Sequence, residues 1–217
     1  TGGTEADTIT LTTTLTGMTV NLGAGADALV LADVANTATI ANVESVTGGT
    51  DDDAITLSTG VAAGVFDLGL GTDALTLANG ANTATVSNTE TITASTGAHS
   101  VTLATSLTGV TIDLGAGNDS LILANVANAA TITNIENVTG GTDADDITLA
   151  TQATGGLINL GAGTDSLTLG NFNNTLTVSN VETLTGDSGD DTIAFGAALA
   201  GAVIDLDAGT DAVTFGN

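Results

Sequence analysis

The chain has 217 residues, of which 25 are Asp or Glu and none is Lys or Arg, so its formal net charge at pH 7 is −25. This charge excludes nucleic-acid binding, because no side chain could neutralise phosphates, and it opposes contact with an anionic membrane surface. The absence of Cys excludes disulfides and thiol chemistry, and no apolar run approaches the roughly 18 residues of a membrane span. Each carboxylate must therefore face water, accept backbone hydrogen bonds, be protonated or bind a cation.

A repeat of 46 residues runs through the chain without insertion or deletion. Its best-formed segment is Ile112–Leu123, IDLGAGNDSLIL, and the equivalents of Leu114 are Leu22, Leu68, Leu160 and Leu206. The repeats are 1–46, 47–92, 93–138, 139–184 and a partial 185–217, and we expect them to form a single solenoid array. Because no polar cap is recognisable, we expect this array to be a segment of a longer chain or fibre.

Apolar residues alternate at a spacing of two within each repeat, which is the periodicity of β-strands. In the first repeat, strands are expected around 9–11, 20–22, 29–31, 40 and 46, separated by Gly, Asn, Asp and Thr. Gly2–Leu11 also resembles Leu22–Leu31, which divides the repeat into parts of about 20 and 26 residues. We therefore expect an all-β solenoid with two coils per repeat, although a single coil of 46 residues is also compatible with the pattern.

The turn sequences GAGNDSLIL (Gly115–Leu123) and GDSGDDTIA (Gly186–Ala194) resemble the nonapeptide of repeat-in-toxin (RTX) proteins, which include bacterial surface-layer proteins and giant adhesins. Good and degenerate copies alternate along nearly the whole chain. The resemblance implies a right-handed parallel β-roll or β-helix with calcium ions between stacked turns. The Asp ligands it implies are Asp7, Asp27, Asp53, Asp73, Asp119, Asp145, Asp165, Asp191 and Asp211. The implied glycines of the turns are Gly23, Gly25, Gly69, Gly71, Gly115, Gly117, Gly161, Gly163 and Gly209.

The residue chemistry is compatible with this implication. Glycine permits the positive φ that turns carbonyls toward one point, and carboxylate and carbonyl oxygens suit Ca²⁺. Stacked Asp side chains about 5 Å apart would repel by roughly 3 kcal/mol per pair at an effective dielectric of 20, and a divalent ion would reverse the sign. Ordinary Asp-Gly turns without metal are the alternative interpretation.

Some turns depart from the pattern. Glu5, Asp51 and Asp143 replace the middle glycine, and TASTGAHSV places His99 where Asp is expected, so we predict no calcium in that turn. A transition-metal ligand is the less favoured interpretation of His99. Four recurring glutamates are expected either to accept backbone hydrogen bonds or to add a calcium contact: Glu44, Glu90, Glu136 and Glu182. Two series of recurring Asn, at Asn36 and Asn42 and their equivalents, are expected to form ladders between stacked copies.

These features favour a calcium-binding structural module outside the cell, at a bacterial surface, in an adhesin stalk, a surface layer or a matrix fibre. Calcium is the expected partner, together with self-association into fibres or layers. An ice-binding solenoid is an alternative, because Thr37/Thr39, Thr83/Thr85 and Thr175/Thr177 form T-x-T pairs, although only once per repeat. A polysaccharide-acting β-helix enzyme is disfavoured, because no basic residue is present and no carboxylate pair is unique, and we expect no enzymatic activity.

Overall fold

The computed structural model describes residues 2–106, 108–197 and 201–216, so the predicted array ends at positions 1 and 217 lie outside the described part. In this part the chain forms 23 β-strands and no helix, and all described strand pairs are parallel. The all-β parallel solenoid that the repeat predicts is therefore confirmed. Since it lacks helices, the described chain also has none with the length and apolarity needed to cross a bilayer.

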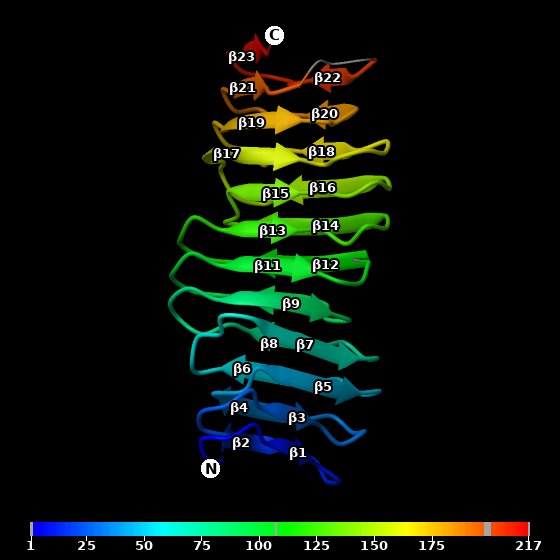
Figure 1. Ribbon diagram of the computed structural model, residues 1–217. Helices are drawn as coiled ribbons and strands as arrows, with labels where there is room; N and C mark the ends of the chain where they lie inside the picture. The colour runs from blue at the N-terminus through cyan, green and yellow to red at the C-terminus, as the bar shows by residue number, and fades with distance from the viewer. Residues whose placement is uncertain (1, 107, 198–200, 217) are drawn as a thin grey trace. The chain divides into compact units, whose positions relative to one another are not determined.

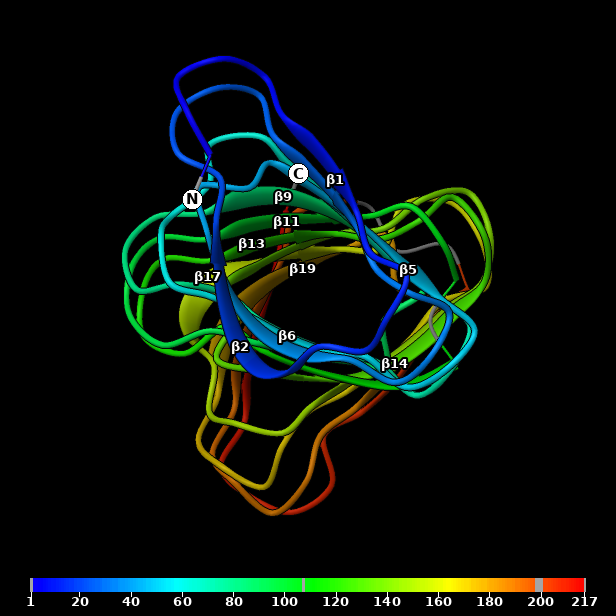
Figure 2. The same ribbon diagram turned by 90° about the horizontal axis from the view of Figure 1, so that it is seen from below.

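The chain divides into two compact units, Thr1–Thr105 with Leu114–Gly117, and Ser106–Asp113 with Asn118–Asn217. Each unit contains an odd sheet and an even sheet, named for the strand numbers, and successive strands alternate between the two. Figure 1 shows the strands of each unit as successive rungs, and Figure 2 looks along the stack, with β1 and β5 facing β2 and β6.

The first unit contains eleven strands. Its odd sheet is β1 (Thr8–Thr10), β3 (Ala28–Val30), β5 (Ser45–Gly49), β7 (Gly64–Gly69), β9 (Thr83–Ser87) and β11 (Ser100–Leu103). Its even sheet is β2 (Thr16–Asn21), β4 (Thr37–Ala41), β6 (Ala54–Leu57), β8 (Ala74–Thr76) and β10 (Thr91–Thr93).

The second unit contains twelve strands. Its odd sheet is β13 (Ser120–Ile122), β15 (Asn137–Thr139), β17 (Thr154–Asn159), β19 (Thr175–Ser179), β21 (Thr192–Phe195) and β23 (Ala212–Phe215). Its even sheet is β12 (Thr108–Asp113), β14 (Asn128–Thr133), β16 (Asp145–Leu149), β18 (Ser166–Thr168), β20 (Thr183–Thr185) and β22 (Val203–Asp205).

The repeat corresponds to two and a half coils, not to the two coils expected from the sequence. Residues 1–46 and 47–92 each contribute five strands, β1–β5 and β6–β10, and two strands complete one coil. The additional strand arises because 37–49 is broken into β4 and β5 by a tight turn at Asn42, whose φ of 51° is left-handed. Equivalent strands of consecutive repeats consequently lie in opposite sheets, as β1 and β6 do in the first unit.

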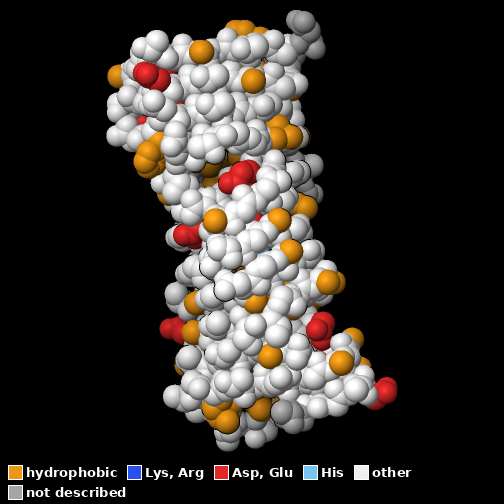
Figure 3. Space-filling view, turned by 90° about the vertical axis from the view of Figure 1, so that its left-hand side faces the viewer, with side chains coloured by type: hydrophobic (Ala, Val, Ile, Leu, Met, Phe, Trp, Pro, Cys, Tyr) orange, Lys and Arg blue, Asp and Glu red, His pale blue; other side chains and the backbone are white. Residues whose placement is uncertain are grey.

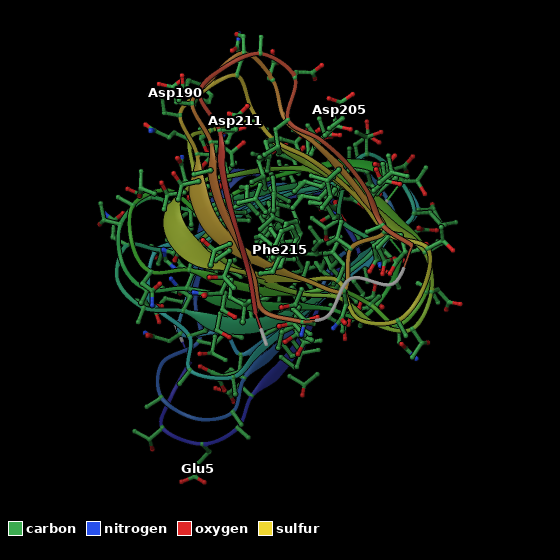
Figure 4. The ribbon with its side chains drawn as sticks, turned by 90° about the horizontal axis from the view of Figure 1, so that it is seen from above. Glu5, Asp190, Asp205, Asp211 and Phe215 are labelled. Carbon is green, nitrogen blue, oxygen red and sulfur yellow. The ribbon has the colours of Figure 1, made fainter. Side chains whose placement is uncertain are left out.

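The core lies between the two sheets of each unit and is built from stacked apolar columns. In the first unit, Leu29 is in register with Val46 and Val46 with Phe66, and each of these side chains is at most 1% exposed. In the second unit, the rings of Phe195 and Phe215 stack with 5.8 Å between centroids, and Phe215 lies over the interior of the last coil (Figure 4). Phe215 itself is 64% exposed, whereas complete burial of a side chain such as Leu29 or Phe66 contributes roughly 1.5–3 kcal/mol, so the buried columns are the main apolar contribution to stability.

Candidate functional site

The predicted Asp ligands lie at the corners of the coils, each at or immediately before the start of a strand. In the first unit, Asp7 and Asp27 precede β1 and β3 of the odd sheet, whereas Asp53 and Asp73 precede β6 and β8 of the even sheet. The nine aspartates therefore do not form one continuous column. The structure brings them together within repeats, on alternating edges of the solenoid.

Each repeat contributes one set of stacked acids, which we call the Asp–Asp–Glu triad. The complete triads are Asp7–Asp27–Glu44, Asp53–Asp73–Glu90 and Asp145–Asp165–Glu182. In the sequence of the third repeat, His99 stands at the first position, and the second unit holds Asp119 and Glu136, which are joined by a hydrogen bond. The partial fifth repeat contains Asp191 and Asp211. All the first and second aspartates except Asp7 and Asp211 are buried.

Within a triad, the carboxylates at the second and third positions each accept the backbone N–H of the acid in the preceding coil. The Asp53 N–H donates to Asp73 Oδ1 over 2.7 Å, and the Asp73 N–H donates to Glu90 Oε2 over 2.7 Å. The same bonds, at 2.7–2.9 Å, join Asp7 to Asp27 to Glu44, Asp145 to Asp165 to Glu182, Asp119 to Glu136, and Asp191 to Asp211. Of the two roles left open for the glutamates, backbone hydrogen bonding is therefore confirmed.

An asparagine from the preceding repeat caps the first aspartate. Asn36 donates both its backbone N–H and its Nδ2 to Asp53 Oδ1 at 2.9 Å, while its own Oδ1 accepts the Leu15 N–H at 3.0 Å. Asn174 makes the same two bonds to Asp191. The expected ladder between copies of Asn is therefore wrong, because equivalent Asn residues of consecutive repeats lie in opposite sheets. The sequence does contain an indication of the observed contact: Asn36 and Asp53 are 17 residues apart, the same separation as Asp73 and Glu90.

The second Asn series also bonds to other residues than its own copies. Asn42 Nδ2 donates to Asn21 Oδ1 at 3.0 Å, and Asn88 Nδ2 donates to Asp67 Oδ1 at 2.7 Å. All four members have a left-handed φ of 49–52°, namely Asn42, Asn88, Asn134 and Asn180. Their shared role is to turn the chain sharply before each Glu, which positions the Glu side chain against the coil below.

The triads leave buried carboxylate oxygens without hydrogen-bond partners. The Oδ2 atom is buried and unpartnered in Asp27, Asp53, Asp73, Asp145, Asp165 and Asp191. An unpartnered buried acceptor is costly, and for an ionised carboxylate the cost is larger. Since the chain has no Lys or Arg, a proton, a bound cation, an ordered water molecule or a shift of the turn must satisfy these atoms.

This environment raises the pKa of three triad aspartates, Asp53, Asp73 and Asp165. Burial raises the pKa of Asp73 to about 6; the Asp53 N–H bond opposes this rise, and the charges of Asp53, Glu90 and Asp52 add to it. Burial likewise raises the pKa of Asp53, against the hydrogen bonds from Asn36. Burial is also the main cause of the raised pKa of Asp165. Burial at these three positions thus favours the neutral form of the carboxyl group or one neutralised by a cation.

The predicted glycines allow the coils to approach closely at these corners. Gly23, Gly69, Gly115 and Gly161 have positive φ values of 77–102°, and Gly25, Gly71 and Gly163 have values of 140–158°. A Cβ on Gly69 would lie 2.1 Å from the Gly49 carbonyl oxygen of the neighbouring coil, so no larger residue fits without movement. Gly117 and Gly209 lie in the same type of turn, and in the fifth repeat Asp207 takes the left-handed conformation with φ 57°.

The additional acids of the turns are exposed. Glu5, Asp51 and Asp143 face solvent, and the acidic side chains visible in Figure 3 form small separate groups. Figure 4 shows Glu5 at the tip of an N-terminal turn, and Asp190 close to Asp211 at the corner of the last coils. These acids therefore add charge near the triads without being part of them.

The donor chemistry of the triads fits a hard cation such as Ca²⁺, which takes six to eight oxygen ligands from carboxylates, carbonyls and water. The feature that fits a cation is the set of unpartnered Oδ2 atoms, which lie close to backbone carbonyl oxygens of the turns. At Gly48, for example, Asp53 Oδ2 and the Leu68 carbonyl oxygen lie near the same point: a Cβ added to this glycine would be 2.6 Å from the first and 2.1 Å from the second. In the described residues no three His, Cys, Asp or Glu side chains gather closely enough to hold a metal by themselves. Carbonyls and water would therefore supply most ligands of an ion, whose chemical contribution would be to neutralise stacked carboxylates.

Comparison of the chain with protein-family models, with curated proteins and with solved structures finds no match. The repeat architecture and the stacked acids are therefore the observations from which a function is argued.

Proposed function

We propose that this chain is a structural repeat module of an extracellular assembly, such as a surface layer, an adhesin stalk or a matrix fibre, and that calcium stiffens it by neutralising the Asp–Asp–Glu triads. The observation that carries the proposal is the series of buried, unpartnered Asp Oδ2 atoms in a chain without a single Lys or Arg. The regular solenoid supports a scaffold role, because successive coils repeat the same parallel strand pairing and the same buried apolar columns.

The electrostatic argument concerns the acids of one triad. Asp53, Asp73 and Glu90 lie on three successive coils, which are spaced by about 4.8 Å in a parallel sheet. Their repulsion opposes folding, and a cation that binds the folded turn and not the unfolded chain stabilises the fold by mass action. In an environment rich in calcium, such as the outside of a cell, this coupling would keep the module rigid.

The proposal predicts that calcium raises the melting temperature of the metal-free protein and that EDTA or EGTA lowers it again. D73N and D165N should reduce this response, because Asn retains the Oδ1 acceptor and removes the charge. Circular dichroism during thermal unfolding measures the temperature, and calorimetry measures the bound ions.

D33N is the matched control for these variants. Asp33 Oδ1 accepts the Thr50 N–H at 2.8 Å, and Asn125 Oδ1 accepts the Thr142 N–H at 2.8 Å in the equivalent place, so Asn is already tolerated there. D33N should therefore keep the calcium response of the unaltered protein. Equal melting curves in millimolar calcium and in EGTA would refute the calcium part of the proposal.

A second candidate function, ice binding, is favoured by one feature of the even sheets. The T-x-T pair at Thr37/Thr39 has no equivalent in the third repeat, which has Ala129 in the first position. The columns of Thr in register are nevertheless continuous, because non-equivalent strands fill the gaps. In the first unit the column is Thr19, Thr39, Thr56, Thr76 and Thr93. In the second unit it is Thr111, Thr131, Thr148, Thr168 and Thr185. Such columns present hydroxyl and methyl groups at the strand spacing of about 4.8 Å.

If the columns bind ice, the protein should show thermal hysteresis, and T56Y in the middle of the first column should abolish most of it. T47Y on the odd sheet is the control, because Thr47 is exposed on a strand outside the column and its replacement should leave the hysteresis unchanged. Absence of thermal hysteresis in the unaltered protein rules out this second function.

A further inference from the structure

The turn between β8 and β9 contains the one Asn-Gly pair of the sequence, Asn79 and Gly80, and both residues are exposed. The other complete repeats have Asp33-Val34, Asn125-Val126 and Asn171-Phe172 in the equivalent place. Glycine lacks the side chain that would obstruct attack by its own backbone nitrogen on the carbonyl carbon of the preceding Asn side chain. The sequence therefore makes Asn79 the most reactive Asn of this series.

The fold leaves the side chain of Asn79 unheld, in contrast to its equivalents. Asp33 Oδ1 and Asn125 Oδ1 each accept the N–H of the Thr 17 residues later, at 2.8 Å. The residue 17 positions after Asn79 is Thr96, which pairs instead with Ala116 in an isolated bridge. Over the described ranges 2–106, 108–197 and 201–216, the Asn79 side chain makes no hydrogen bond. Its amide group is therefore free to turn toward the backbone.

The attacking atom, the backbone nitrogen of Gly80, is restrained in the folded chain. The Gly80 N–H donates to the Thr96 carbonyl at 2.7 Å, and a Cβ on Gly97 would lie 2.5 Å from the Gly80 carbonyl carbon, so the two coils touch here. The nitrogen can attack only after this hydrogen bond opens. Exposed turns open locally at a cost far below that of global unfolding. The rate of reaction at Asn79 is consequently set by the opening of the corner formed by 78–82 and 96–97.

We propose that Asn79 is a self-modification site, at which the side-chain amide is lost by ring closure with Gly80 when this corner opens. The Gly80 nitrogen attacks Asn79 Cγ, the N–H proton and the side-chain amino group leave together as ammonia, and a succinimide ring forms. Water then cleaves one of the two bonds between a ring carbonyl carbon and the nitrogen. Cleavage at Cγ gives an Asp at position 79 with an ordinary peptide bond, and cleavage at the backbone carbonyl carbon gives an isoaspartyl residue.

The two products differ in their effect on the fold. An Asp at position 79 is compatible with the turn, because Asp33 occupies the equivalent place in the first repeat. The isoaspartyl product adds a methylene group to the backbone between residues 78 and 82. In this segment Asn82 Nδ2 donates to the Ala78 carbonyl at 2.7 Å and to the Gly80 carbonyl at 2.9 Å. The isoaspartyl form should therefore weaken these bonds and accelerate amide hydrogen exchange over 78–83.

Mass spectrometry of the unaltered chain, kept folded in mildly alkaline buffer, tests the proposal. A protease that cuts after Asp and Glu releases three equivalent peptides, 74–90, 120–136 and 166–182, which contain Asn79, Asn125 and Asn171. The change from amide to acid should accumulate at Asn79 at least about tenfold faster than at the other two positions, because a glycine follows it. Equal rates at the three positions would overturn the proposal. So would a folded chain whose Asn79 stays intact for as long as a urea-unfolded sample takes to react.

Two variants separate the contribution of the sequence from that of the fold. N79Q should keep its amide, because Gln must close a larger ring. V126G places a glycine after Asn125, whose Oδ1 still accepts the Thr142 N–H at 2.8 Å, so Asn125 should react more slowly than Asn79 in the same molecule. Equal rates at Asn79 and Asn125 in V126G would overturn the role assigned to the unheld side chain. Neither result depends on calcium, because Asn79 lies outside the triads.

Discussion

At the scale of single residues, Asp73 shows how the fold makes ordinary turn residues unusual. Its side chain is 1% exposed, its Oδ1 accepts the Asp53 N–H at 2.7 Å, and its Oδ2 has no partner. An isolated turn with the same sequence would leave this carboxylate in water. The coils above and below therefore cause the raised pKa, and the cost of ionising Asp73 is a property of the stack.

A pH dependence follows from Asp73 in the metal-free protein. Because its pKa in the folded state is raised from 3.8 to about 6, the contribution of Asp73 to stability is fully present below about pH 3.8 and is lost as the pH rises through about 6. The raised pKa values of Asp53 and Asp165 act in the same direction. In EDTA, the free energy of unfolding should be larger near pH 4 than near pH 7, by on the order of 2 kcal/mol for Asp73 alone.

D73N is the control for this experiment, because Asn keeps the acceptor and cannot titrate in this range. Its unfolding free energy should depend less on pH between 4 and 7 than that of the unaltered protein. A protein that is more stable at pH 7 than at pH 4 in EDTA would contradict the assignment of Asp73 as a carboxyl that prefers its proton.

At the scale of elements, the strands were more predictable than the turns that join them. The alternation around Leu29 and Val46 identified strands, because one buried face imposes a period of two. The division of the repeat into coils was not predictable from this pattern, since the turn at Asn42 is only three residues long and depends on a left-handed φ. The triad partners were also hidden, because residues 17 and 20 apart become neighbours only once the coil length is known.

The candidate site was likewise predictable only in part. The nine aspartates were recognised from the turn sequence, and eight of them adjoin a second Asp of the same repeat through a backbone bond. Asp119 is the exception, because the first position of its triad is His99. The asparagine cap was not recognised, because Asn36 bonds to Leu15 in the preceding coil and to Asp53 in the following one, and these residues are neighbours only in the folded stack.

A prediction at this scale concerns the turn that ends at Glu90. Glu90 Oε2 accepts the buried N–H of Asp73 at 2.7 Å, so E90A should leave that N–H unpaired and cost about 1–3 kcal/mol. E90Q keeps an acceptor and removes one of the charges that raise the pKa of Asp73. In EDTA at pH 7, E90Q should therefore be at least as stable as the unaltered protein, as measured by denaturant unfolding.

E44A and E44Q repeat the comparison in the first repeat, where Glu44 Oε2 accepts the Asp27 N–H at 2.9 Å. If the Gln and Ala variants lose equal stability at both positions, charge relief is not a factor in these turns. The hydrogen bond alone would then account for the recurrence of Glu.

At the scale of the whole molecule, the missing cations and the repeat architecture act together. A chain with 25 acids and no Lys or Arg gains nothing from ion pairs, so its stability depends on apolar columns and on backbone bonds to carboxylates. Spreading the triads along the chain keeps any one corner from collecting more than three stacked acids. If the proposed function is correct, the stability of such a chain would respond to the protons and cations in its surroundings.

The length of two and a half coils also gives the repeat a symmetry that the sequence does not display. Within the first unit, the second repeat is related to the first by a half-turn and a rise of about 12 Å, which is an approximate twofold screw operation. The Asp7–Asp27–Glu44 corner and the Asp53–Asp73–Glu90 corner consequently lie on opposite edges of this unit. If cations bind at both corners as proposed, the bending forces on the two edges would oppose each other, and the unit would stiffen without curling.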